Sequence, residues 1–358
     1  MPNSQPKVTV LMPVYNGELY LREAINSILN QTFTDFELII LDDCSKDGSV
    51  DLIKTYTDER IRLIANPVNQ GLRFILNQGG KLARAEYIAR MDCDDISLPH
   101  RLAKQVEYLD RHPEIAIVGA QSIYIDTEGK VVESQNMFRC AAESSSIRWT
   151  ASYECPFVHP LVMFRKQVLW GELGGYDEMA VFAEDYEMWL RLLSNNYQGA
   201  NLPEVLLKYR VNPKSMMNSA NITTKLNALS PMRKKYLDGL IPGFDQEKEI
   251  INNFFNTQNP ELASATNTAL DTLRNQYISI YLNGQITKDL LINMARERAR
   301  IGYSLFSIDR WKATSLMLQA VWGYPGICRE IPFIKTIYLI LFGASGRELI
   351  RSFRAKSN

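Results

Sequence analysis

Short apolar runs alternate with helix-spaced apolar positions through the first 120 residues. The helix-spaced segments lie at 19–29, 49–56, 72–85 and 99–111, with apolar residues every three or four positions. The apolar runs predict buried strands at 8–12, 36–41, 61–64, 87–91 and 115–119. Strands separated by helices of this length favour a parallel sheet with right-handed crossovers. The pattern therefore predicts a doubly wound α/β fold, a mostly parallel sheet with flanking helices.

The pattern changes twice after residue 120. Strand-like pieces at 122–125, 161–164 and 205–209 are mixed with loops and one clear helix at 184–193. Beyond residue 221 the spacing is helical throughout and no motif is found. We therefore expect one domain at 1–220 and a helical C-terminal region at 221–358.

Composition excludes several classes of protein. The 40 Lys and Arg residues balance 40 Asp and Glu residues, so the chain lacks the excess positive charge by which nucleic-acid-binding proteins neutralise phosphates. Five scattered cysteines without a CxxC pair argue against a disulfide framework or a zinc site and favour a reducing compartment. No secretory signal and no apolar run of about 20 residues is found. We expect a cytoplasmic protein.

Charge is concentrated at the C-terminal end. Residues 291–358 hold eleven Lys and Arg against four acids, and the apolar run IPFIKTIYLILFGA at 331–344 lies among them. This run predicts either a helix packed on the protein or an anchor that holds the protein peripherally at the inner face of the cytoplasmic membrane. A third alternative is that the C-terminal region forms a contact between copies of the chain.

Carboxylates follow two of the predicted strands. Asp92, Asp94 and Asp95 come directly after the strand at 87–91, where open α/β sheets bind ligands. Clustered carboxylates repel one another unless a cation lies between them, and hard oxygen ligands suit Mg²⁺ or Mn²⁺. The alternative is a solvated acidic turn that caps the helix starting near Pro99. Asp42 and Asp43 follow the strand at 36–41. A carboxylate at this position would accept a hydrogen bond from a base or a ribose, or it would form an Asx turn.

Several segments together resemble the family 2 inverting glycosyltransferases of GT-A fold. The resemblance covers residues 5–215. Its motifs are VTVLMPVYNG at 8–17, LDDCSKDGS at 41–49, NQG at 69–71, AEYIARMDCDD at 85–95, HPLVMFR at 159–165, GGYDE at 174–178 and AEDYEMWLRL at 183–192. It implies a nucleotide-sugar-binding half at about 1–120 and an acceptor-binding half at about 121–220.

The resemblance implies roles for the donor site. Asp43 would hold the nucleotide base, implied to be uracil, and Pro13 and Tyr15 would line its pocket. Asp94 would be the direct metal ligand. Asp92 would be a second ligand or would contact the ribose or a metal-bound water. Asp95 would instead cap the following helix.

The resemblance implies further roles near the acceptor. Asp185 of the pair Glu184-Asp185 would be the catalytic base, although an acid in the first turn of a helix also suits the helix dipole. His159 would contact the acceptor or the diphosphate, or serve a structural role. The acceptor would be a saccharide or a lipid-linked saccharide.

The chain departs from the family pattern at three positions. Cys44 and Cys93 stand where the family usually has Gly and Ala, and both are small enough to pack. The family's Tyr-Arg-x-His reads Tyr-Arg-Val-Asn here and ends at Asn212. Loss of that His removes an expected metal ligand and moves the neutralisation of the diphosphate to Arg210 or Lys214.

Sugar transfer from a nucleoside diphosphate needs both a metal site and a carboxylate base. A divalent cation neutralises a diphosphate leaving group, and a carboxylate base takes the proton from the acceptor hydroxyl, so a single displacement inverts the anomeric centre. Two alternatives are a nucleotidyltransferase, which would need a Gly-rich basic loop near the N-terminus, and a protein that binds a nucleotide sugar without turnover. A dehydrogenase is disfavoured because no GxGxxG follows the first strand.

Overall fold

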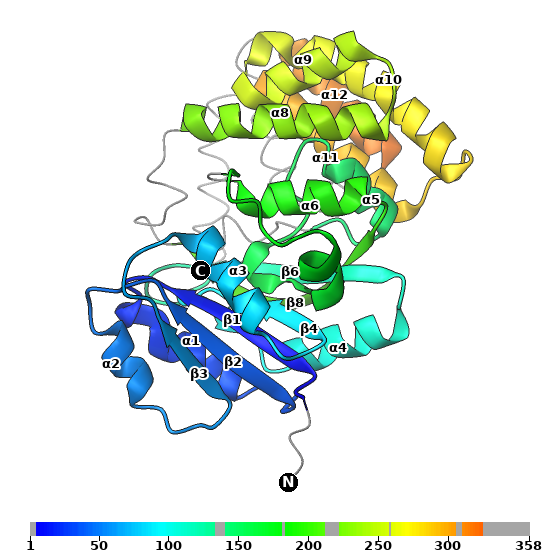
Figure 1. The fold of residues 1–358 in the computed structure, drawn as a ribbon. Coiled ribbons are helices and arrows are strands. Elements are labelled where there is room, and N and C mark those ends of the chain that lie inside the picture. The colour runs from blue at the N-terminus through cyan, green and yellow to red at the C-terminus, as the bar shows by residue number, and fades with distance from the viewer. Residues whose placement is uncertain are drawn as a thin grey trace, which may run out of the picture. The chain divides into compact units, whose positions relative to one another are not determined.

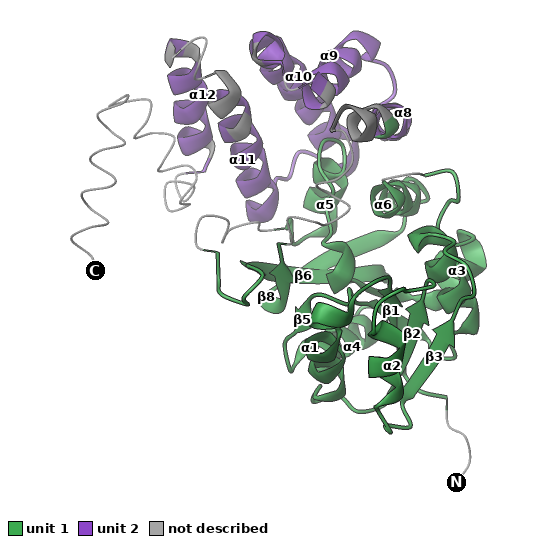
Figure 2. Ribbon diagram, turned by 90° about the vertical axis from the view of Figure 1, so that its left-hand side faces the viewer, with its two compact units in different colours: residues 1–228 green, residues 229–358 purple. Residues whose placement is uncertain are grey.

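The computed structural model describes residues 5–132, 140–180, 183–211, 222–257, 259–305 and 310–324. The chain forms two compact units, Met1–Ala228 and Leu229–Asn358 (Figure 2). The first unit contains an eight-stranded sheet in the order β3-β2-β1-β4-β7-β6-β8-β5 (Figure 1). The strands are β1 Val8–Val14, β2 Phe36–Asp42, β3 Ile61–Ala65, β4 Tyr87–Arg90, β5 Ile96–Ser97, β6 Ile115–Ile125, β7 Met163–Arg165 and β8 Gln198–Arg210.

The first half of the sheet confirms the predicted fold class. β1 pairs in parallel with both β2 and β4, and β2 pairs in parallel with β3. All residues of β1 and β2 are buried, as expected for strands covered by helices on both faces. Because the strands are parallel, their carboxyl ends lie at one edge of the sheet and present the following loops together.

The second half of the sheet differs from the prediction. The expected fifth strand and the piece at 122–125 form one strand, β6, and β7 lies between β6 and β4, antiparallel to both. β8 pairs in parallel with β6 over its whole length and begins well before residue 205. Irregular register along β6 and β8 interrupts the alternation of apolar positions that sequence reasoning relies on. The predicted piece at 161–164 forms β7, but its place in the sheet, beside a strand about 70 residues earlier in the chain, leaves no local signal.

Helices cover the sheet where the apolar spacing predicts them. In α1, for example, Leu21, Ala24, Ile25 and Ile28 are buried on one face. The helices of the first unit are α1 Glu18–Leu29, α2 Ser49–Lys54, α3 Leu72–Leu82, α4 Arg101–Arg111, α5 Ser144–Thr150 and α6 Glu184–Ser194, with short turns at His159–Leu161 (η2) and Gln167–Glu172 (η3).

The second unit is helical in the part that the structure describes. α8 Ile222–Leu240 spans the boundary between the units and is followed by α9 Asp245–Thr257, η4 Pro260–Leu262, α10 Ala263–Leu282, α11 Lys288–Leu305 and α12 Arg310–Gly323. Within the described ranges, no helix is both long enough and apolar enough to cross a bilayer. The run at 331–344 lies outside the described residues.

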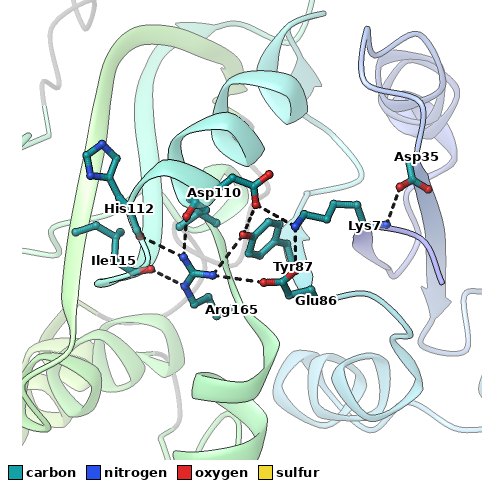
Figure 3. Close-up of polar contacts among 9 residues, drawn as sticks. Lys7, Asp35, Glu86, Tyr87, Asp110, His112, Ile115 and Arg165 are labelled. Atoms are coloured by element: carbon teal, nitrogen blue, oxygen red, sulfur yellow. Dashed lines mark hydrogen bonds and ion pairs between the residues drawn. The ribbon is translucent and has the colours of Figure 1, made fainter. Parts of the chain in front are cut away.

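A polar network joins the strands at the amino ends of β1 and β4 (Figure 3). Lys7 Nζ lies 2.9 Å from carboxylate oxygens of both Glu86 and Asp110. The Tyr87 hydroxyl donates to Asp110 at 2.6 Å, and Arg165 Nη2 donates to the Leu109 carbonyl at 2.7 Å. The network ties β1, β4, β7 and α4 together at the edge opposite the strand ends that carry the predicted site.

Candidate active site

Three carboxylates meet in the loop after β4. Asp92, Asp94 and Asp95 each bring one carboxylate oxygen within 4.8 Å of the other two. Burial, and then the charge of Asp92, raise the pKa of Asp94 to about 6. The same two causes, with the charge of Asp94, raise the pKa of Asp95 well above its usual range. The cluster is therefore electrostatically strained without a cation.

Asp95 does not cap α4, so that interpretation of the sequence is wrong. Its side chain is fully buried, and its Oδ1 accepts the backbone N–H of Arg210 at 2.7 Å. Its Oδ2 is buried without a hydrogen-bond partner in the structure. The carboxylate points into the fold because β8, which carries Arg210, passes beside the loop, a long-range contact that sequence reasoning cannot see.

Arg90 is the site residue that sequence reasoning missed. It is the last residue of β4, its side chain is only 4% exposed, and its Nη1 lies 2.5 Å from Asp92 Oδ2. Although burial alone would lower the pKa of Arg90, the Asp92 carboxylate raises it above the ordinary value. Its Nε has no hydrogen-bond partner in the structure. The available signal was a charged residue in an otherwise apolar strand directly before the acids.

A second pair of carboxylates lies in the first turn of α6. Burial, and then the neighbouring Asp185, raise the pKa of Glu184. Burial also raises the pKa of Asp185, against the opposing effects of the Tyr186 N–H and the Arg90 charge. The Cys155 thiol lies 3.8 Å from Asp185 Oδ2. Because Arg90 acts on both acids, one buried guanidinium is electrostatically coupled to the α6 pair and to the β4 cluster.

His159 is uncharged at neutral pH. Burial, and then the charge of Arg90, lower the pKa of His159 well below its usual range. Its Nε2 lies 2.9 Å from the Tyr176 hydroxyl, and its ring meets the edge of the fully buried Trp189. A neutral imidazole cannot neutralise a diphosphate by charge. Contact of His159 with the acceptor or the diphosphate stays a prediction.

The loops after β1 and β2 form the predicted base-binding side. Both carboxylate oxygens of the buried Asp43 accept backbone N–H groups at 2.8 Å, from Gln70 and Gly71, so Asp43 fixes the NQG loop. Tyr15 is half exposed, whereas Pro13 is buried inside β1. Contact of these three residues with a base stays a prediction.

Of the two cysteines that depart from the family pattern, Cys93 packs as expected. Cys44 has a φ of +65°, a left-handed conformation that explains why glycine is usual there. Cys93 packs on the core beside Gly17, where an added Cβ would meet the Cys93 sulfur at 2.9 Å.

Arg210 is engaged with protein groups. Its side chain is buried, Nε donates to the Asp94 carbonyl at 2.8 Å, Nη2 pairs with Glu23 at 2.6 Å, and the guanidinium lies over the Tyr20 ring. Arg210 therefore holds the backbone of the acidic loop. Its contact with a diphosphate stays a prediction, and Asn212 and Lys214 lie outside the described residues.

Comparison with known proteins identifies the class. The model of glycosyl transferase family 2 matches residues 9–171. EpsE of Bacillus subtilis, named as a glycosyltransferase, is 37% identical over 213 residues, which are 58% of this chain and 74% of EpsE. The O-antigen biosynthesis glycosyltransferase WbnJ of Escherichia coli is 35% identical over 60% of this chain and 83% of WbnJ. The chain belongs to glycosyl transferase family 2 and is a glycosyltransferase.

Solved structures share the fold. TarS 1-349 of S. aureus in complex with UDP-GlcNAc has a TM-score of 0.53 and 18% identity, covering 90% of each chain. The mannosyltransferase PcManGT of Pyrobaculum calidifontis in complex with GDP-Man and Mn²⁺ has a TM-score of 0.52 and 18% identity, covering 91% of this chain and 88% of that one. At this identity the likeness establishes the GT-A-like fold alone.

Proposed function

We propose that the protein transfers a sugar, with inversion and with a divalent metal, from a nucleoside-diphosphate sugar to a hydroxyl of a saccharide or lipid-linked saccharide. The observation that carries the proposal is that two groups of partly or fully buried acids, one after β4 and one at the start of α6, both interact with Arg90. The name of WbnJ, an O-antigen biosynthesis glycosyltransferase, supports a role in surface-polysaccharide assembly. UDP is the proposed donor nucleotide, as in the TarS complex.

The acidic loop fits a divalent cation. Asp92 and Asp94 offer carboxylate oxygens within 4.8 Å of each other, the ligand type that Mg²⁺ and Mn²⁺ prefer. Asp95, with its second oxygen buried and unpaired, contributes negative charge behind them. A cation bound there would neutralise charge on the diphosphate leaving group. Arg90 and Arg210 hold the two ligands in place, one through the Asp92 side chain and the other through the Asp94 carbonyl.

Asp185 is the proposed catalytic base. Its partly buried carboxylate and raised pKa bring its basicity closer to neutrality than that of an ordinary Asp, which favours proton transfer from a hydroxyl. The N–H of Tyr186 donates to its Oδ1 at 2.7 Å and fixes its orientation. Its Oδ2 takes the acceptor proton while the sugar leaves the diphosphate on the opposite face. The neutral His159–Tyr176 pair would line the same region.

The proposal also covers where in the cell the protein works. We propose that the protein works at the inner face of the cytoplasmic membrane through its C-terminal region, because a lipid-linked acceptor would be found there. The sequence charge of residues 291–358 supports this placement.

A nucleotide-release screen tests the proposal. Purified protein is incubated with UDP-, GDP- and dTDP-sugars, with EDTA or Mn²⁺, and free nucleotide diphosphate is measured. We expect metal-dependent release of one nucleotide, lost in Asp94→Ala and Asp185→Ala and unchanged in Asp51→Ala, a control on the exposed face of α2.

Calorimetry with each donor separates the roles. Asp94→Ala should lose donor binding, whereas Asp185→Ala should bind donor without turnover. Binding without release by the wild-type protein, even with acceptor saccharides added, would favour a non-catalytic binding protein. Release of diphosphate from a nucleoside triphosphate would favour a nucleotidyltransferase.

A further inference from the structure

An exposed apolar stripe runs along helix α12 in the second unit. Trp311, Leu318 and Trp322 are 86%, 63% and 91% exposed, and Ser315 between them is also exposed. At 100° per residue, these four positions fall within about 60° of one another around the helix. From Trp311 to Trp322 the stripe covers twelve residues, and the eleven steps between the two tryptophans measure roughly 16 Å along the helix axis.

The opposite face of α12 is already packed. Ala313, Leu316, Met317 and Ala320 are buried, and their directions centre about 180° from the stripe. This inner face packs on α11, which lies beside α12 (Figure 2). α12 therefore has two apolar faces, of which the folded unit uses one. Two tryptophans nearly free of contact are not explained by packing, and such a patch marks an interaction site.

The chemistry of the stripe and its chain context favour a lipid surface over a second copy of the chain. Tryptophan is the residue most suited to the boundary between water and hydrocarbon, because its ring is apolar and its N–H needs a polar partner. Residues 291–358, which include α12 and all but the first three residues of α11, carry eleven basic and four acidic residues. This positive charge attracts anionic lipid and opposes pairing of the same region in two copies.

We infer that α12 is an interfacial helix that lays Trp311, Leu318 and Trp322 into the surface of an anionic bilayer. The inference places membrane contact on a described helix. It is independent of the proposed sugar transfer, since its test needs no donor and no acceptor.

Tryptophan fluorescence tests the inference in the full-length protein. Trp149 and Trp189 are fully buried in the first unit, so Trp311 and Trp322 are the residues that a lipid surface can reach most readily. With vesicles of phosphatidylglycerol and phosphatidylcholine carrying brominated chains, we expect quenching and a blue shift of the emission. Pure phosphatidylcholine vesicles should give much less of both, because the charge attraction is absent.

Variants locate the contact. Trp311→Ser/Trp322→Ser should lower vesicle co-sedimentation at least about tenfold, because two apolar side chains no longer enter the lipid. Ile280→Ser, at a half-exposed position on α10, is the matched control and should bind as the wild type does. Circular dichroism and nucleotide release should be unchanged in both variants.

Three results would overturn the inference. Unquenched emission with anionic vesicles would mean that another segment covers the stripe. Equal vesicle binding by the double variant would move the contact elsewhere. Dissociation of a wild-type dimer by the double substitution, with no vesicle binding by either protein, would assign the stripe to a contact between copies.

Discussion

Replacing Arg90 by Met removes one charge from the centre of the site and keeps a side chain of similar length. The guanidinium is 4% exposed and pairs at 2.5 Å with Asp92, which is 30% exposed. Removing one partner of a buried ion pair costs about 3–5 kcal/mol. Because Asp92 can regain part of its hydration, we expect a value near the lower end, about 3 kcal/mol. For a unit of this size the midpoint of thermal unfolding should fall by about 6–12 °C.

A metal ion should compensate for the lost charge. Without Arg90, three carboxylates within 4.8 Å lack their nearest buried cation, so Mn²⁺ should stabilise the variant more than the wild type. At a concentration of 100 times its dissociation constant, a ligand stabilises a folded protein by about 2.7 kcal/mol. Mn²⁺ should therefore restore most of the loss in Arg90→Met.

The assay is thermal unfolding of both proteins in EDTA and in a MnCl₂ series. Arg62→Met is the matched control, because Arg62 pairs at 2.6 Å with the buried Glu37 but Arg84 remains as a second partner for that acid. It should cost about 1 kcal/mol or less and respond to Mn²⁺ as the wild type does. A fall of less than 2 °C in Arg90→Met, or an equal Mn²⁺ response in all three proteins, would refute the reasoning.

Three further substitutions test other parts of the site and fold. Asp185→Asn should keep donor affinity by calorimetry and lower kcat by about 10²–10⁴, the usual contribution of a general base, and an unchanged kcat would remove Asp185 from that role. Metal affinity should fall as pH falls through about 6, where Asp94 takes up a proton. In EDTA, by contrast, the stability of the folded protein should fall as pH rises from about 4 to 6. The folded-state pKa of Asp94 lies above its unfolded value, so ionisation of Asp94 destabilises the protein over this range. This slope should be weaker in Asp94→Asn, and equal slopes by thermal unfolding would contradict the assignment. Tyr87→Phe loses the 2.6 Å bond to Asp110 and should lower the midpoint by about 2–4 °C with unchanged donor affinity, and a changed affinity would mean that the network acts on the site.

The sequence predicts those parts of the molecule that depend on local pattern. β1, β2, β4 and α6 lie where the apolar spacing places them, and the three acids of the loop after β4 lie together. The insertion of β7 between β4 and β6 was not predictable, because it depends on a segment 70 residues away.

Side-chain partners across the fold were also beyond local reasoning. The partnership of Asp95 with the Arg210 backbone joins positions 115 residues apart, and no pattern in either segment points to the other. Arg90 was not predicted as a site residue because the strand that contains it was interpreted as apolar core. A charge in a buried strand next to clustered acids is itself evidence of a site, since a buried cation persists only where opposite charge stabilises it.

The charge balance of the site explains why metal and donor should bind together. Five carboxylates, in the β4 cluster and the α6 pair, act on Arg90, and Arg210 is already paired with Glu23. A diphosphate entering alone would add negative charge to a site that already has an excess of it. Burial, and then the charge of Asp92, raise the pKa of Asp94 to about 6, and protonation of Asp94 relieves part of the repulsion. A divalent cation relieves more of it and also offers positive charge to the phosphates. The donor should therefore bind weakly in EDTA at any pH, and tightly with Mn²⁺ only above about pH 6.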